Sequence, residues 1–246
     1  MNRLNDRYPV EFDDIQALVR YGHGRLTESV FLLLRIADPA AARQWLAKAP
    51  VTTAKPASPL PDTALQVAFT ATGLSRLGLD DRLTEHFSEE FICGMSADES
   101  RSRRLGDTGC NRPQDWRWGG NSEDIPDLLL LLYSAPGKRS DQLAQIRSER
   151  FTTAFEVQQE LSATATGPEE PFGFVDGISQ PLIDWQQSVD PAPRLHDSYS
   201  NRLAVGEVLL GYPNEYARDT ARPLLDPASL PHARMLPAAT EQPDLK

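Results

Sequence analysis

Hydrophobic and polar positions follow recognisable periods through roughly the first two thirds of the chain. Mostly apolar runs predict three central strands, and an alternating run predicts a fourth. The four predicted strands span residues 26–36, 64–70, 127–135 and 152–161. Runs of this length, separated by polar and proline-rich stretches, indicate a folded domain built on one sheet.

Helical patterns lie between these strands. In the stretch 38–50, Asp38 can cap a helix, Pro39 suits its first position, and Ala41, Trp45 and Leu46 share a face. A second helix is expected from Ser140 or Asp141 through Arg150, with Leu143 and Ile146 directed inward. Before the third strand we expect a short helix at 71–79, a helix at 82–95 and a long ordered loop at 96–127.

The resulting order is strand, helix, strand, strand, helix, strand, which is the split βαβ, or ferredoxin-like, arrangement of the α+β class. After Leu161 the periodic pattern stops, and the rest of the chain is rich in proline, with a further short strand expected at 206–212. We therefore expect a ferredoxin-like domain over 1–162. The remainder, 163–246, is expected to be an extension that packs on a partner.

Composition and charge exclude several classes of function. The 246 residues are 40% hydrophobic and 24% charged with a formal net charge of −10, which disfavours binding to nucleic acid or to an anionic membrane. Apolar runs such as 128–133 are too short to span a bilayer. The N-terminal stretch has no apolar signal core and no twin-arginine pair, so a cytoplasmic location is expected. Cys93 and Cys110 are expected to be free thiols.

Metal-binding and nucleotide-binding patterns are absent from the sequence. It contains no P-loop and no GxGxxG, and its histidines have no partner at zinc-ligand spacing. We therefore expect no metal ligand set within this chain. The four histidines are His23, His86, His196 and His232.

The stretch "PFGFVDGISQP", residues 171–181, combines aromatic residues, glycines and one carboxylate. Taken alone, Asp176 followed by Gly177 is a common turn pair, and Asp176 then only caps a helix or closes an Asx-turn. The three positions Gly173, Asp176 and Gly177 are weak evidence by themselves. A glycoside hydrolase pair of Asp176 and Asp184 is an alternative, but no sugar cleft is indicated.

The extended form "FGFVDGISQP" is more specific, and it resembles the distal loop of the dye-decolourising haem peroxidases. Two further stretches, "DIQALVRYGHGRLTESVFLLLRI" (14–36) and "GEVLLGYPNEYARDTARPLLDP" (206–227), also resemble larger members of that family. The resemblance spans nearly the whole chain and corresponds to the N-terminal half of such a protein. It implies a ferredoxin-like fold, as the strand order does.

The resemblance implies that Asp176 lies over the distal face of haem b. There it would take a proton from one peroxide oxygen and return it to the other as a general acid–base group. Gly173 and Gly177 would let the backbone turn and approach a flat porphyrin. Ser179 and Gln180 would bond near the haem edge, or else only tie the loop together. The residues expected to contact the cofactor are Phe174, Asp176, Gly177, Ile178, Ser179 and Gln180.

The family also needs a proximal histidine and a distal arginine, which the resemblance places in a second ferredoxin-like half. No histidine here has the sequence context of that axial ligand, and nothing marks Arg202, Arg218 or Arg222 as the distal arginine. We therefore expect one subunit of a two-chain peroxidase that shares haem b with a second-half chain. It would reduce hydrogen peroxide and oxidise bulky donors such as dyes.

Two questions stay open at this point. The alternative function is a haem-free interaction or assembly module, and a piece of a longer chain would have the same sequence. Four aromatic residues are candidates for carrying electrons to the surface, but such residues are more often core or loop anchors. These residues are Trp116, Trp118, Trp185 and Tyr212.

Overall fold

The computed structural model describes residues 9–121, 123–164, 169, 172–175, 177, 180–188, 201–216, 218 and 220–223. The chain divides into two compact units. The first, called the sheet unit below, comprises Phe12–Glu85 and Glu89–Ala165, and the second holds the glycine-rich loop and the residues that follow it. Among the described residues, no helix is long and apolar enough to cross a membrane.

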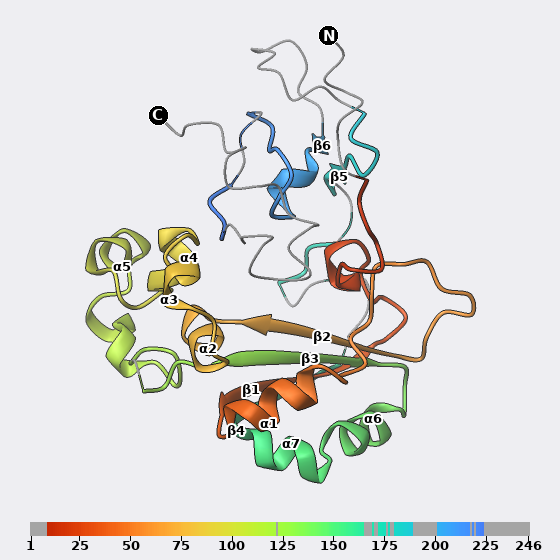
Figure 1. Ribbon diagram of the computed structural model, residues 1–246, viewed down its shortest axis with the longest axis horizontal. Coiled ribbons are helices and arrows are strands. Elements are labelled where there is room, and N and C mark those ends of the chain that lie inside the picture. The colour runs from red at the N-terminus through yellow and green to blue at the C-terminus, as the bar shows by residue number, and fades with distance from the viewer. Residues whose placement is uncertain are drawn as a thin grey trace. The chain divides into compact units, whose positions relative to one another are not determined.

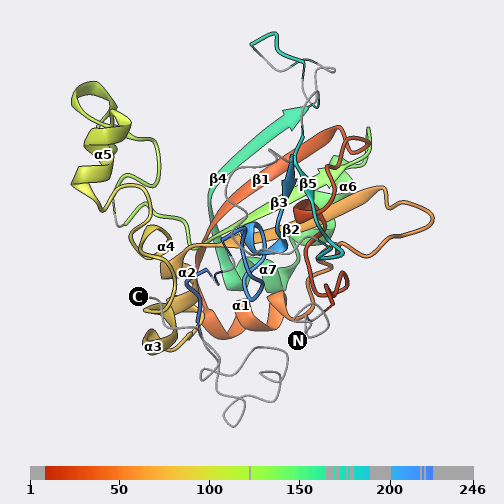
Figure 2. The same ribbon diagram turned by 90° about the horizontal axis from the view of Figure 1, so that it is seen from above.

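A four-stranded sheet forms the centre of the sheet unit. Its strands are β1 (Glu28–Ile36), β2 (Thr63–Phe69), β3 (Leu128–Ser134) and β4 (Phe155–Thr164), in the order β2-β3-β1-β4. Every neighbouring pair is antiparallel. Figure 2 shows the four strands side by side. The predicted strands and the α+β class with an antiparallel sheet are confirmed.

Three helices cover one face of this sheet, namely α1 (Pro39–Leu46), α6 (Arg139–Ile146) and α7 (Glu149–Ala154) (Figure 1). Alternate residues of the strands point towards them, because side chains of a strand alternate between its faces. Leu32 and Leu130, which pair directly across β1 and β3, are fully buried in the resulting core.

An aromatic cluster closes this core between α1, α7 and β4. The ring of Trp45 lies edge-on to those of Phe151 and Phe155, with centroids 5.6 and 5.4 Å away. As predicted, Asp38 caps α1 by accepting hydrogen bonds from the backbone N–H groups of Ala40 and Ala41. The cap and the cluster together fix the orientation of α1 against the sheet.

The predicted single helix after the third strand is wrong, because two helices occupy the region. α6 ends at Ile146, and Ser148 then caps α7 by accepting from the backbone N–H of Phe151 at 3.4 Å. Serine favours helix starts over helix interiors because its hydroxyl replaces a missing backbone partner. As a result α7 takes up residues 149–154, and the fourth strand begins at Phe155.

The segment between β2 and β3 also differs from prediction. The expected helix over 82–95 is broken in two, since Ser88 followed by Glu89 and Glu90 suits the start of a new helix. The expected loop at 96–127 contains a further helix, which Asp98 caps and Gly106 ends in the left-handed conformation. These elements lie beyond one end of the sheet (Figures 1 and 2). They are α2 (Ala71–Arg76), α3 (Asp81–Thr84), α4 (Glu89–Cys93), α5 (Glu99–Leu105), η3 (Gly109–Asn111) and η4 (Pro113–Asp115).

The residues before β1 bind to the free edge of β2. The side-chain amide of Gln16 donates to the carbonyl oxygen of Val67 at 2.8 Å and accepts from its N–H at 2.7 Å. Next to it, the backbone N–H of Leu18, in η2 (Ala17–Val19), donates to the side chain of the buried Gln66. A glutamine side chain thus pairs with β2 as an additional strand would.

The second unit contains little regular structure among its described residues. The short strands β5 (Leu182–Ile183) and β6 (Arg202–Leu203) pair in parallel, and η5 (Val205–Glu207) follows. The strand predicted at 206–212 is therefore wrong. Gly206 packs so closely on the backbone of Tyr212 and Pro213 that a Cβ atom there would clash, so the chain folds back on itself instead of extending.

Candidate functional site

The glycine-rich loop belongs to the second unit, and the structure describes only part of it. Of the predicted site residues, Phe174, Gly177 and Gln180 are described, whereas Asp176, Ile178 and Ser179 lie outside the described residues. The backbone of Val175 forms an isolated antiparallel bridge with Glu169. The backbone of Glu169 therefore lies beside that of Val175, just before Asp176.

Gly173 and Gly177 have a backbone conformation that favours glycine. Their φ angles are +83° and +82°, in the left-handed region that residues with a Cβ atom rarely adopt. Apart from the adjacent residues, nothing in the described part of the chain lies within 4 Å of the place where a Cβ would stand at either glycine. Backbone conformation therefore requires glycine at both positions, and the space beside each one is open.

The described side chains of the loop are apolar and exposed. Phe172 is 87% exposed and Phe174 is 71% exposed. Val175, and Leu182 just after the loop, are exposed as well. Burial of large aromatic side chains normally stabilises a fold, so exposed aromatic residues on a loop form a candidate surface for binding a ligand or a partner. Gln180, in contrast, is tied within the unit, since Asn201 donates from its side chain to the Gln180 carbonyl oxygen at 2.7 Å.

A buried carboxylate anchors the chain just after the loop. Asp184 is 6% exposed, and its Oδ1 accepts a hydrogen bond from the hydroxyl of Ser188 at 2.8 Å. Arg202 in β6 in turn donates to that hydroxyl. These contacts give Asp184 a structural role at the β5–β6 pair.

The two described histidines do not form a ligand set. His23 lies in the turn before β1, with its ring centroid 4.7 Å from that of Tyr133, and burial lowers the pKa of His23. Burial also raises the pKa of Tyr133. His86 is exposed in the turn after α3, and His196 and His232 lie outside the described residues. No group of three or more potential metal ligands occurs in the part of the chain that the structure describes.

The other residues singled out from the sequence are spread over both units. Cys93 and Cys110 are free, as predicted. Trp116 is held in its loop by a hydrogen bond to the Asn111 carbonyl, while Trp118 is 41% exposed. Among the three arginines, Arg222 is buried, which nothing in its sequence context indicates.

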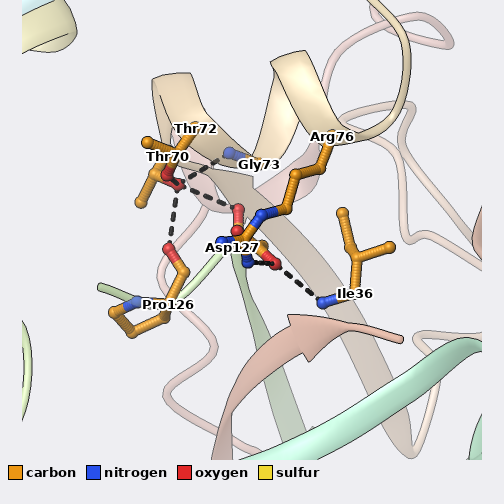
Figure 3. A network of polar contacts seen from close by, with 7 residues as sticks. All are labelled: Ile36, Thr70, Thr72, Gly73, Arg76, Pro126 and Asp127. Atoms are coloured by element: carbon orange, nitrogen blue, oxygen red, sulfur yellow. Dashed lines mark hydrogen bonds and ion pairs between the residues drawn. The ribbon is translucent and has the colours of Figure 1, made fainter. Parts of the chain in front are cut away.

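A buried polar centre that sequence reasoning missed lies in the sheet unit (Figure 3). Asp127, fully buried, accepts hydrogen bonds from the backbone N–H of Ile36 and from Arg76, each at 2.7 Å. The only signal in the sequence was an aspartate directly before a run of leucines. This centre joins the end of β1, α2 and the start of β3, and it has a structural role.

Comparison with known proteins gives consistent results in sequence and in structure. No family model matches the chain. It is 28% identical over 193 residues to a dye-decolorizing peroxidase of Mycena epipterygia, covering 75% of this chain and 34% of the relative. It is 30% identical over 180 residues to peroxidase 2 of Mycetinis scorodonius, covering 70% of this chain and again 34% of the relative.

Solved structures show the same fold. The crystal structure of a decolorizing peroxidase from Auricularia auricula-judae matches 86% of this chain and 46% of its own, with a TM-score of 0.65 and 24% sequence identity. The chain therefore spans about a third of the length of the curated relatives it matches, at 34% of each, and less than half of the matched crystal structure.

Proposed function

The chain belongs to the dye-decolorizing peroxidase family, and on this premise we propose that it is one part of a haem peroxidase completed by a second chain. The assembled protein would reduce hydrogen peroxide and oxidise bulky donors such as dyes. The second chain would supply the proximal histidine and the distal arginine. The observation that carries this proposal is the exposed apolar loop around the two left-handed glycines.

The strand order supports a finer description of the sheet unit. Helix α1 connects β1 to β2 past the intervening β3, and α6 and α7 connect β3 to β4 past β1. This is the connectivity of the split βαβ, ferredoxin-like arrangement. We propose that the second chain contributes another half of the same kind.

The described loop residues fit a flat, largely apolar cofactor. Phe174 and Val175 offer exposed apolar surface, and the open space beside Gly173 and Gly177 allows close approach of the backbone. Haem b, when bound, would supply an iron that binds and activates peroxide. Gln180, whose carbonyl oxygen is already bonded to Asn201, would steady the end of the loop beside the cofactor. The predicted contacts of Ile178 and Ser179 complete this proposed set.

Asp176 is proposed to transfer a proton between the two oxygen atoms of hydrogen peroxide. Its carboxylate would accept a proton from one peroxide oxygen and return it to the other, which is general acid–base work. An aspartate with an ordinary pKa of about 3.9 remains ionised in acid, where a histidine would be protonated. Activity that persists at acidic pH is therefore expected of this site.

Haem titration with and without a second-half protein tests the proposal. We expect a Soret band typical of histidine ligation, and peroxide turnover, only when both chains are present. In that mixture Asp176→Asn should slow peroxide consumption by about 100-fold or more, with haem still bound, since general acid–base groups contribute at that scale.

Glu169→Gln is the matched control. It removes a carboxylate just before the loop, at a residue whose backbone pairs with that of Val175. It should leave turnover unchanged. Haem binding in neither sample would reject the split peroxidase and favour the haem-free interaction module. Equal turnover of Asp176→Asn and the unmodified chain would remove Asp176 from the mechanism.

A further inference from the structure

We propose that a cleft on the helix-covered side of the sheet binds a small hydroxylated organic carboxylate. The cleft has a volume of about 360 Å³ and lies between α1, the start of β2, α6 and α7. All its lining residues belong to the sheet unit. The proposal does not depend on the peroxidase function, because it uses none of the residues of the glycine-rich loop.

The floor of the cleft is apolar and well ordered by packing. Trp45 is 8% exposed, and its ring is held edge-on between Phe151 and Phe155. Leu65 and Ile146, both buried core residues, also line the cleft. A flat indole and two aliphatic side chains suit a ring or a short hydrocarbon body.

Two polar atoms in this floor have no hydrogen-bond partner within the described chain. The side-chain N–H of Trp45 donates no bond there, and Gln142 donates from Nε2 to the Ala64 carbonyl at 2.9 Å while its Oε1 accepts none. Gln142 is 7% exposed, yet neither atom is sealed from solvent. Because both residues line the cleft, the cleft is where a ligand reaches them.

These two atoms specify the polar part of the ligand. The Trp45 N–H is a donor only, and the Gln142 carbonyl oxygen is an acceptor. A hydroxyl group can accept from the first or donate to the second. Because both atoms are open to water, a ligand that replaces these water contacts with its own hydrogen bonds is favoured over one that cannot.

The charge of the lining specifies the other end of the ligand. Lys48 and Arg150 both line the cleft, and no aspartate or glutamate does. Neither cation forms an ion pair with any residue that the structure describes. In a chain with a formal net charge of −10, a cleft with two cations and no carboxylate selects an anion. A carboxylate at Lys48 or Arg150, joined to a hydroxylated ring beside Trp45, combines the charge, the hydrogen-bonding atoms and the apolar floor of the cleft.

Titration of the full chain with 4-hydroxybenzoate tests this assignment. Binding should shift the indole N–H resonance of Trp45 in a ¹H–¹⁵N spectrum, with that resonance identified by its loss in Trp45→Phe. The neutral analogue 4-hydroxybenzamide should bind at least tenfold more weakly. Benzoate, which lacks the hydroxyl, should also bind more weakly and shift the Trp45 resonance less.

Variants at the exposed rim avoid any disturbance of the core. The double variant Lys48→Gln with Arg150→Gln should weaken 4-hydroxybenzoate binding at least tenfold. Lys138→Gln, which removes an exposed cation just before α6 and outside the cleft, should change it less than twofold. Equal affinity for the carboxylate and the amide, an unmoved Trp45 resonance, or unchanged binding by the double variant would each overturn the proposal. No haem and no second chain are needed, so the result is independent of the peroxidase test.

Discussion

Arg76 reaches from α2 to the buried carboxylate of Asp127, and their atoms Nη1 and Oδ2 lie 2.7 Å apart. The aspartate side chain is fully buried while that of the arginine is 44% exposed. The same carboxylate oxygen accepts from the backbone N–H of Ile36, and the other oxygen, Oδ1, has no hydrogen-bond partner among the residues that the structure describes. One carboxylate thus holds a helix and two strands together at a single point.

Asp127→Ala should destabilise the chain. It leaves the buried N–H of Ile36 unsatisfied, which costs about 1–3 kcal/mol, whereas the side chain of Arg76 is 44% exposed and can turn to water. Asp127→Asn should cost less, because its amide oxygen still accepts from Ile36. Urea unfolding measures both. Asp141→Ala on the exposed side of α6 serves as the control, with a change of about 0.5 kcal/mol or less. Similar values for Asp127→Ala and the control would contradict this account.

Gly73→Ala should also destabilise this region, by steric clash. A Cβ atom at Gly73 would stand 1.9 Å from the backbone oxygen of Asp127, so α2 would have to move away from β3. Overpacking of this kind costs about 1–3 kcal/mol or more. Gly24→Ala is the matched control, since nothing lies within 4 Å of its Cβ position. Thermal unfolding of the two variants compares them directly, and equal melting temperatures would show that α2 shifts freely.

The stability of the chain should fall in mild acid because of His23. Burial lowers its folded pKa below the ordinary value of 6.5. Below that value the unfolded chain takes up a proton that the folded ring resists, so the unfolded state binds more protons and the free energy of unfolding falls as pH decreases. The loss begins near 6.5 and continues down to the lower folded pKa.

His23→Gln should flatten this dependence, measured by urea unfolding at about pH 7.5 and about pH 5. His86→Gln, at an exposed position, should leave the slope unchanged. The comparison rests on the slope, because loss of the ring contact with Tyr133 also lowers the stability of His23→Gln at both pH values. An equal slope in His23→Gln and the unmodified chain would assign the acid sensitivity to other groups.

Phe174→Ser should separate binding from stability. The side chain is 71% exposed, so its loss should change the free energy of unfolding by about 0.5 kcal/mol or less. If the loop contacts haem as proposed, the same change should weaken haem binding in the two-chain mixture severalfold. Leu60→Ser, at another exposed apolar position, should alter neither quantity. Unchanged haem affinity in Phe174→Ser would remove Phe174 from the cofactor contacts.

The periodicity of apolar residues was sufficient to predict the strands of the sheet unit. Short leucine-rich or alternating runs are typical of strands with one or both faces buried, and these runs became β1 to β4. The start of α1 was predictable from two local signals, the capping residue Asp38 and the proline that follows it, Pro39. The sequence reasoning failed before Glu89, where a new helix begins, and at Ser148, where a capping serine divides one predicted helix into two. It also failed at Gly206, because close packing against residues further along the chain leaves no trace in a local pattern.

The resemblance of "FGFVDGISQP" to the distal loop of the family was visible in the sequence because the motif consists of adjacent residues. Contacts between residues far apart in sequence were decided only by the tertiary structure. Ile36, Arg76 and Asp127 meet at one carboxylate, Gln16 pairs with Val67, and Trp45 and Gln142 share a cleft. Each of these depends on which strands and helices pack together. Single polar residues in separate segments carry no pattern until the fold brings them within hydrogen-bonding distance.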